Sequence, residues 1–176
     1  MGLFKSKEEK KQRKQEKDIK KEASVGFMGE TLQSIGKIPS GKPVGLSLKP
    51  DLQVLNIHHD KIDITLPYGR IIGFRLESET TVAKNGSSVT RALVGGALFG
   101  TTGALVGGMS AKGNTKTKWI GTLSYVDKDC NPCELYFLQW GLSGPYEGDT
   151  KHYGASLFET KVNEIVTRYA EAITEL

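Results

Sequence analysis

A run of uncharged residues at positions 92–111 constrains the fold of this 176-residue chain more than any other segment. The run, ALVGGALFGTTGALVGGMSA, contains six glycines and lies between Arg91 and Lys112. Its first five residues, Ala-Leu-Val-Gly-Gly, recur at positions 104–108. Glycines four positions apart leave a groove along a helix, and a second helix can then approach until the backbones touch. The spacing therefore predicts close helix packing rather than catalytic chemistry.

The glycines that we expect to form this packing surface are Gly95, Gly96, Gly100, Gly103, Gly107 and Gly108. The apolar residues that we expect to face lipid or a partner are Leu93, Leu98, Phe99, Leu105 and Val106. As one helix, the run would be roughly 30 Å long, which is enough to span a bilayer. It is only weakly apolar, however, and each glycine costs about 1 kcal/mol of helix propensity. A single span is therefore disfavoured.

Strand-like segments precede and follow the run, and both its ends must emerge on the same side if these strands share one sheet. A helical hairpin with its turn at 100–103 satisfies this condition, with arms of roughly 12–15 Å. Three interpretations stay open: a hairpin that mediates self-association, a re-entrant or spanning element, and an insert folded against its own domain. An exposed apolar patch of this size promotes aggregation in a monomer, which favours a partner.

Alternation of apolar with polar residues predicts antiparallel strands before the insert, and a segment rich in aromatic and β-branched residues predicts that the strands resume after it. Ile62, Ile64 and Leu66 alternate in this way, and a turn is expected before them at 58–61. The expected strands cover residues 44–48, 54–57, 61–66, 72–82, 119–126 and 134–140.

The chain ends in a segment with helical periodicity. A capping box, Ser156-x-x-Glu159, predicts where this helix begins. One apolar stripe follows, with charged residues opposite, and it must cover an apolar surface such as the sheet. The stripe consists of Phe158, Val162, Ile165, Val166, Tyr169 and Ile173.

The excess of positive charge is confined to residues 1–22, which carry nine Lys or Arg against five Asp or Glu. The other 154 residues carry 15 of each, so the net charge of +4 describes an arm and not a basic fold. Nucleic-acid-binding domains usually carry positive charge on the folded surface, so nucleic acid is a disfavoured partner. We expect a helical or disordered arm, serving as a solubilising tail or as an electrostatic tether to anionic lipid. The tether residues would be Lys10, Lys11, Arg13, Lys14, Lys17, Lys20 and Lys21.

The motifs that suggest catalysis or metal binding are incomplete. Cys130 and Cys133 form a single C-x-x-C, whereas a structural zinc site needs four ligands and a thioredoxin-like pair needs a βαβ context. A turn that contains two cysteines is the simpler interpretation, and a redox or metal role is the alternative. The histidines have no ligand spacing, and neither a phosphate loop nor a nucleophile elbow occurs. We therefore expect no catalytic residues, no metal, no cofactor and no enzymatic activity.

The strand series over 44–138 and the helix over 156–176 resemble the pleckstrin-homology-like (PH-like) fold in its bacterial versions. The segment 91–112 resembles glycine-zipper insertions of some bacterial and phage proteins with such domains. The resemblance implies an α+β fold: an antiparallel PH-like sheet or partly open barrel, a C-terminal amphipathic helix and an inserted glycine-rich helical hairpin. The basic signature of phosphoinositide-binding members is missing, because Lys42, Lys49 and Lys61 are too scattered to match it.

We thus expect a charged arm (1–22), a linker (23–43) and a PH-like domain (44–176) that contains the hairpin (91–112). PH-like proteins are usually binding modules, so the resemblance implies a non-enzymatic, membrane-associated scaffold that self-associates through its glycine zipper. A soluble homo-oligomeric bacterial or phage interaction protein is the alternative, and nucleic-acid binding through the arm is a weaker one. The expected partner is a second copy of the chain; an anionic membrane surface and another protein are further candidates.

The cysteine content and the charged N-terminus also bear on location. Two cysteines are too few for a secreted disulfide scaffold, and the N-terminus lacks the apolar segment of a signal peptide. We expect a cytoplasmic protein with reduced thiols, peripheral at the inner face of the membrane if the arm binds lipid.

Overall fold

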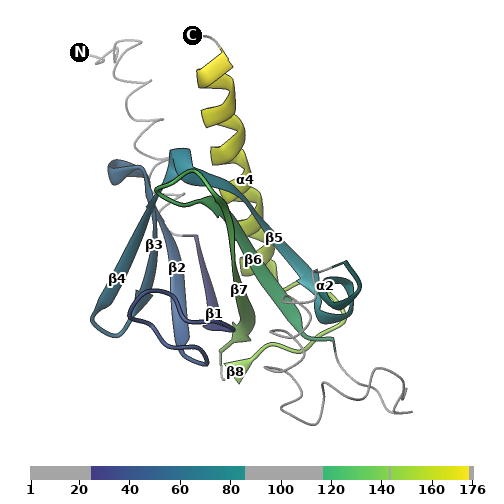
Figure 1. The fold of residues 1–176 in the computed structure, drawn as a ribbon. Helices are drawn as coiled ribbons and strands as arrows, with labels where there is room; N and C mark the ends of the chain where they lie inside the picture. The colour runs from purple at the N-terminus through teal and green to yellow at the C-terminus, as the bar shows by residue number, and fades with distance from the viewer. Residues whose placement is uncertain (1–24, 86–116, 143, 175–176) are drawn as a thin grey trace, which may run out of the picture.

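A computed structural model describes residues 25–85, 117–142 and 144–174. In this part of the chain, an antiparallel sheet has the strand order β4-β3-β2-β1-β7-β6-β5, and β8 pairs with β7 (Figure 1). The strands are β1 Gly26–Thr31, β2 Pro43–Lys49, β3 Val54–His59, β4 Ile62–Pro67, β5 Ile71–Ser78, β6 Trp119–Val126, β7 Pro132–Gly141 and β8 Gly144–Pro145. The helical segments are α2 Glu79–Asn85, α4 Tyr153–Thr174 and the 3-10 turns η1 Pro50–Leu52 and η2 Tyr68–Arg70.

The charged arm 1–22 and the glycine-rich insert 91–112 lie outside the described residues. The same holds for every glycine, apolar and cationic residue that was assigned a role within these two segments.

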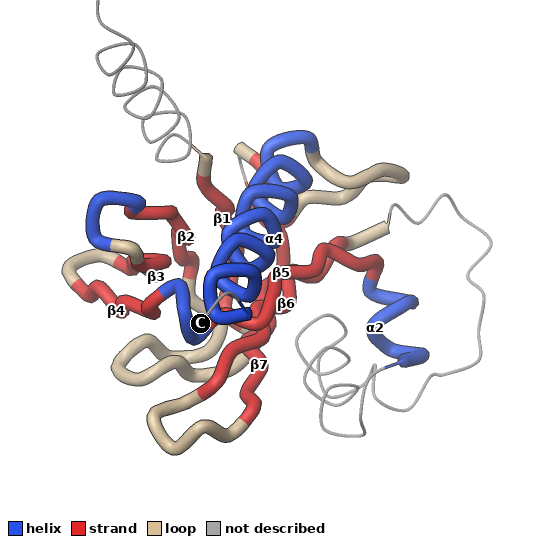
Figure 2. The backbone as a smooth tube through the Cα atoms, turned by 90° about the horizontal axis from the view of Figure 1, so that it is seen from above, coloured by secondary structure: helices blue, strands red, loops and turns tan. Residues whose placement is uncertain are grey.

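The strand pattern confirms the predicted antiparallel sheet with a C-terminal helix. β3, β4 and β6 occupy the segments where alternation or β-branched residues predicted strands. The sheet does not close into a barrel, because β4 and β5 are its two edges and do not pair with each other. Seen from above, α4 crosses the sheet between β2–β4 and β5–β7 (Figure 2).

Residues 23–43 are not the linker that we expected, because they contain β1. This strand pairs with β2 on one side and with β7 on the other, and Phe27 is only 1% exposed. The sequence did not indicate this strand, because two of its six residues are glycines, which are uncommon in strands. Close packing explains why residue 29 is a glycine, since a Cβ there would lie 2.9 Å from the carbonyl oxygen of Leu138.

The expected extension of the strand at 72–82 is also wrong, because β5 ends at Ser78 and α2 follows. The Ser78 hydroxyl accepts a hydrogen bond of 3.2 Å from the Thr81 amide, which stabilises the first helical turn. Val82 is 4% exposed and belongs to a small second core with Ile120 and neighbouring side chains of β7. Burial of Val82 on the sheet thus outweighs the strand propensity of the Thr-Thr-Val segment.

The main core is built around phenylalanines of the sheet and α4. The ring centroids of Phe27 and Phe74 are 5.2 Å apart, and those of Phe74 and Phe158 are 5.0 Å apart, both edge to face. Such pairs contribute about 0.5–1.5 kcal/mol each beyond the area they bury. Gly121 makes room for them, since a Cβ there would lie 2.7 Å from the ring of Phe74.

Helix α4 begins at Tyr153, three residues before the start that the capping box predicted. Phe158, Val162 and Ile165 are buried, as the apolar stripe predicted. Glu159 does not cap the helix; its carboxylate accepts a hydrogen bond of 2.8 Å from the Leu76 amide of β5. The unpaired edge of the sheet offers that donor, and the capping geometry does not form.

Asn163 extends this contact along the edge of β5. Its side-chain oxygen accepts from the Phe74 amide at 3.0 Å, and its side-chain nitrogen donates to the Phe74 carbonyl at 2.9 Å. The side chains of α4 thus take the place of a neighbouring strand, so this edge is closed to strand addition.

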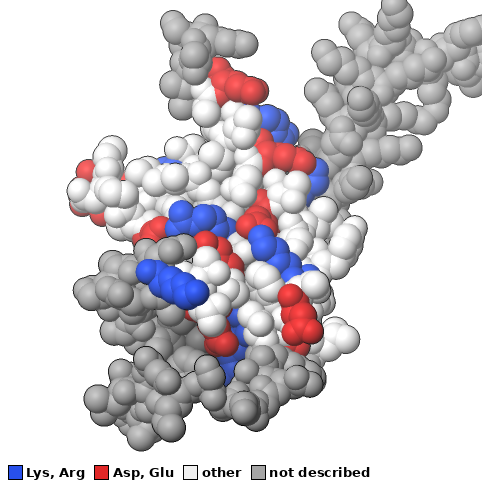
Figure 3. Space-filling view, turned by 90° about the vertical axis from the view of Figure 1, so that its right-hand side faces the viewer, with Lys and Arg blue, Asp and Glu red and all other residues white. Residues whose placement is uncertain are grey.

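Charged residues of both signs mix on the described surface. On the face shown in Figure 3, Lys and Arg side chains lie between Asp and Glu side chains instead of forming a patch of one sign. This distribution agrees with the equal numbers of acidic and basic residues after position 22.

Replacement of Asn163 by Ala should lower the free energy of unfolding by about 1–2 kcal/mol, because two backbone groups of β5 lose their partners. The matched control is Glu164→Ala, which removes only an exposed pair with Lys161 and should change stability by less than about 0.5 kcal/mol. Urea denaturation followed by circular dichroism measures both. Equal losses of stability in the two variants would show that the hydrogen bonds of Asn163 to the edge of β5 do not stabilise the fold.

Candidate functional site

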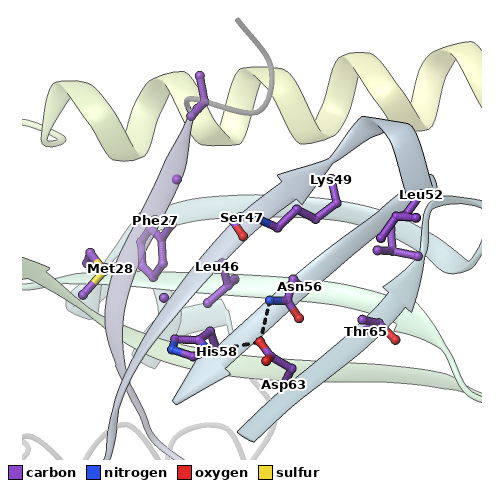
Figure 4. Close-up of a pocket in the computed structure, with 14 residues that line it drawn as sticks. Phe27, Met28, Leu46, Ser47, Lys49, Leu52, Asn56, His58, Asp63 and Thr65 are labelled. Atoms are coloured by element: carbon purple, nitrogen blue, oxygen red, sulfur yellow. Dashed lines mark hydrogen bonds and ion pairs between the residues drawn. The ribbon is translucent and has the colours of Figure 1, made fainter. Parts of the chain in front are cut away.

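The outer face of β1–β4 is hollowed into a groove of about 860 Å³ (Figure 4). Met28 lies at one end and Leu52 at the other, and their side chains are 55% and 72% exposed. The polar residues between them come from β2, β3 and β4. The side chains that line the groove include Met28, Ser47, Lys49, Leu52, Val54, Asn56, His58, Asp63 and Thr65.

Three of these polar residues form one hydrogen-bonded group across β3 and β4. Asn56 donates from Nδ2 to Oδ1 of Asp63 at 2.8 Å, and Nδ1 of His58 lies 3.0 Å from the same oxygen. These bonds, from Asn56 and then His58, hold the pKa of the Asp63 carboxyl below its usual value. The groove therefore contains a carboxylate that stays ionised near neutral pH.

The groove can bind a ligand with apolar groups and hydrogen-bond donors. The Oδ1 atom of Asn56 is buried and has no hydrogen-bond partner among the described residues. The exposed Asp63 carboxylate offers an acceptor between the apolar ends formed by Met28 and Leu52. An extended polypeptide supplies amide donors and apolar side chains at such spacings, and it fits a shallow groove better than a compact small molecule does.

The junction where the insert leaves and re-enters the sheet is a second candidate site. Ser78 pairs with Trp119, and the Glu79 amide donates to the Lys118 carbonyl at 3.0 Å. The loop before α4 also contacts this junction, because the backbones of Lys118 and Glu147 form an isolated antiparallel β-bridge. The chain therefore leaves β5 and enters β6 at neighbouring positions, with α2 and residues 86–116 between them in the sequence.

Glu79 is an unusual carboxylate within this junction. One of its oxygens is buried and has no hydrogen-bond partner among the described residues. Burial raises the pKa of the Glu79 carboxyl, with Lys118 opposing the shift and Glu147 adding to it.

The three histidines make different contacts. His58 belongs to β3 and faces the groove, so the turn expected at 58–61 is shorter, and Asp60 has a left-handed φ of 51° within it. His59 contacts the Pro43 carbonyl at 2.7 Å, and His152 packs edge-on against Tyr146. In the described ranges, no three His, Cys, Asp or Glu residues are placed to hold a metal ion.

Cys130 and Cys133 are free thiols, but they do not share the turn that we expected, because only Cys130 lies in the connection between β6 and β7 and Cys133 belongs to β7. Cys130 is exposed at the tip of the turn, and Cys133 is half-buried opposite Tyr125. In the described part of the chain, no helix is both long enough and apolar enough to cross a membrane.

The groove was missed at the sequence level. Its polar side chains in β3 and β4 are the outward members of an alternation, of which only the part at 61–66 served to predict a strand. That alternation indicates which residues avoid the core, but only the pairing of His58 with Asp63 and of Asn56 with Thr65 brings them into one group.

Comparison with known families gives one match. A family model described as "Glycine zipper containing PH domain" matches residues 39–127, which is half of the chain and includes the insert. The match confirms the predicted combination of a PH-like domain with a glycine zipper. A search of curated proteins gave no match.

Replacement of Glu79 by Gln should stabilise the protein at pH 7. Because the pKa of Glu79 is raised on folding, its ionised form opposes folding, and stability is lost as pH rises through the folded pKa. The gain should therefore shrink as pH falls and vanish below the unfolded pKa. Thermal unfolding between pH 4 and pH 7 measures it, with Glu164→Gln as an exposed control. A gain that is independent of pH would contradict this account.

Proposed function

The chain belongs to the family of glycine zipper containing PH domains, and we propose that it is a non-catalytic scaffold that self-associates through its zipper at a membrane surface. PH-like domains are binding modules, and the groove on β1–β4 is the surface that we assign to a protein partner. The proposal thus gives three tasks to three parts of the chain: the zipper, the groove and the arm.

The observation that carries the proposal is the pairing of Ser78 with Trp119 at the base of the insert. Since β5 and β6 are neighbours, the chain leaves the sheet at Ser78 and returns beside it at Trp119, and the uncharged run of 20 residues lies between these positions in the sequence. A helical hairpin satisfies that geometry, and its glycines at four-residue spacing favour close contact with another helix. A second copy of the chain presents the same surface and is the simplest partner for it.

The groove and the insert are far apart in the strand order. The insert leaves between β5 and β6, whereas the groove lies over β1–β4, at the other side of the sheet. Self-association through the zipper would therefore leave the groove open to an extended segment of another protein.

The basic arm supports attachment to anionic lipid. The described part of the sheet shows mixed charge, so the net positive charge of the chain comes from residues 1–22. Each Lys or Arg near an anionic surface contributes about 1 kcal/mol, and the attraction weakens with salt.

Replacement of Gly96, Gly100, Gly103 and Gly107 by Leu should abolish self-association, because the side chains keep the helices apart. Light scattering of the full chain should then give a smaller mass. The control adds leucine at Ala97 and Ala104, which lie off the lines Gly96–Gly100 and Gly103–Gly107, and should keep the larger mass. If the glycine variant stays oligomeric, or if the unmodified chain is a monomer, the zipper does not mediate self-association.

Replacement of the seven cationic tether residues by Gln should abolish sedimentation with vesicles of phosphatidylcholine and phosphatidylserine. Binding of the unmodified chain should weaken as salt rises and should be low on phosphatidylcholine alone. The control is the double variant Lys61→Gln, Lys128→Gln, which removes two positive charges from turns of the sheet and should leave vesicle binding unchanged. If the unmodified chain binds neither vesicle, it is a soluble oligomer and the membrane part of the proposal is wrong.

A further inference from the structure

The two edges of the sheet differ in how their backbone groups are satisfied. At the β5 edge, Asn163 and Glu159 of α4 bind the amides of Phe74 and Leu76. At the other edge, β4 pairs with β3 and with no other described strand. The edge of β4 is therefore the one that is open to strand addition.

The register of β3 and β4 shows which groups of β4 point outward. Tyr68, next after the strand, donates its amide to the Gln53 carbonyl at 2.9 Å. The preceding pair, Pro67 with Val54, is thus a non-hydrogen-bonded pair, which suits a residue without an N–H. Alternation along the ladder then directs the N–H and C=O groups of Asp63 and Thr65 away from β3.

We propose that β4 pairs with β4 of a second copy of the chain, antiparallel, about a two-fold axis at Ile64. In this register Asp63 of each copy faces Thr65 of the other. Their outward N–H and C=O groups then form four hydrogen bonds, two on each side of the axis.

Side-chain chemistry favours this register over its neighbours. A register centred on Asp63 sets two carboxylates opposite each other, and the lowered pKa of Asp63 keeps both ionised. A register centred on Thr65 sets Asp63 opposite Pro67, which has no N–H to donate. The register centred on Ile64 avoids both defects and places the Thr65 hydroxyl of one copy beside the Asp63 carboxylate of the other.

The core-facing side chains of β4, which are Ile62, Ile64 and Leu66, also match each other across the two-fold axis in this register. Ile64 faces Ile64 of the second copy, and Ile62 faces Leu66. Ile62 and Ile64 are only half-buried in the single chain, although they pack against the core. Pairing would cover the remaining apolar surface of both side chains.

This contact would join the grooves of two copies into one surface, because Asp63 and Thr65 line the groove and lie at its border with β4. The zipper residues follow β5, the other edge strand, in the sequence, so the two contacts use different residues. Two symmetric contacts at opposite edges would link copies into an open chain of alternating interfaces.

A cysteine at the two-fold position tests the register. In a full chain with Cys130→Ser and Cys133→Ser, Ile64→Cys brings two thiols opposite each other, about 4.5 Å apart between Cα atoms, within reach of a disulfide. Mild oxidation should give a cross-linked dimer on a non-reducing gel. Asp63→Cys should not cross-link, because the Asp63 positions lie diagonally across the axis. Cross-linking of Asp63→Cys alone, or of neither, would overturn the proposed register.

A backbone substitution tests the hydrogen bonds. In the variant with leucine at the four zipper glycines, Thr65→Pro removes one outward N–H per copy without touching the bonds to β3, and should weaken dimer formation at least about tenfold in sedimentation equilibrium. Thr65→Val keeps the N–H and should leave the affinity of the dimer unchanged. Equal behaviour of the two folded variants would exclude strand pairing.

The four-glycine Leu variant of the zipper separates this contact from the proposed function. In that variant, the Ile64→Cys cross-link should persist. If the cross-link fails while the unmodified zipper still drives self-association, the β4 contact is wrong and the proposed function stands.

Discussion

β1 pairs with β2 along one side and with β7 along the other, and this double pairing joins the two halves of the sheet. Thr31 faces Phe137 across more than a hundred residues of chain. Gly29 permits the approach, because a side chain there would meet the backbone of β7. Through the same strand, Phe27 enters the cluster of rings that α4 covers, so the sheet, the core and the helix all depend on β1.

The sheet remains open, and its two edges are treated differently. Polar side chains of α4 satisfy the β5 edge, so the C-terminal helix both covers the core and substitutes for a missing strand. The short edge strand β4 keeps outward backbone groups at Asp63 and Thr65. Unpaired strand edges attract further strands unless something blocks them, which is why the difference between the edges matters for assembly.

Prediction from the sequence succeeded where the signal was local and periodic. Alternation in β4 and the stripe from Phe158 to Ile165 each report which residues avoid water. Prediction failed where a distant contact decided the outcome. The segment of β1 is rich in glycine and small residues, and α2 was taken for a strand because Thr80, Thr81 and Val82 favour strands in general. The groove was missed for a related reason, since His58 and Asp63 become neighbours only through strand register.

The sequence by itself determined the class of fold, the amphipathic helix at the end of the chain and the glycine spacing that the family match confirms. These features depend on residues a few positions apart, whose periodicity follows from the geometry of a strand or a helix. Only the tertiary structure decided that β1 bridges the two halves of the sheet, that Glu159 serves a strand edge instead of a helix cap, and that β3 and β4 present a carboxylate in a groove. Each of these depends on which distant groups were left unsatisfied, and a buried or edge polar group binds the partner that the fold brings within reach.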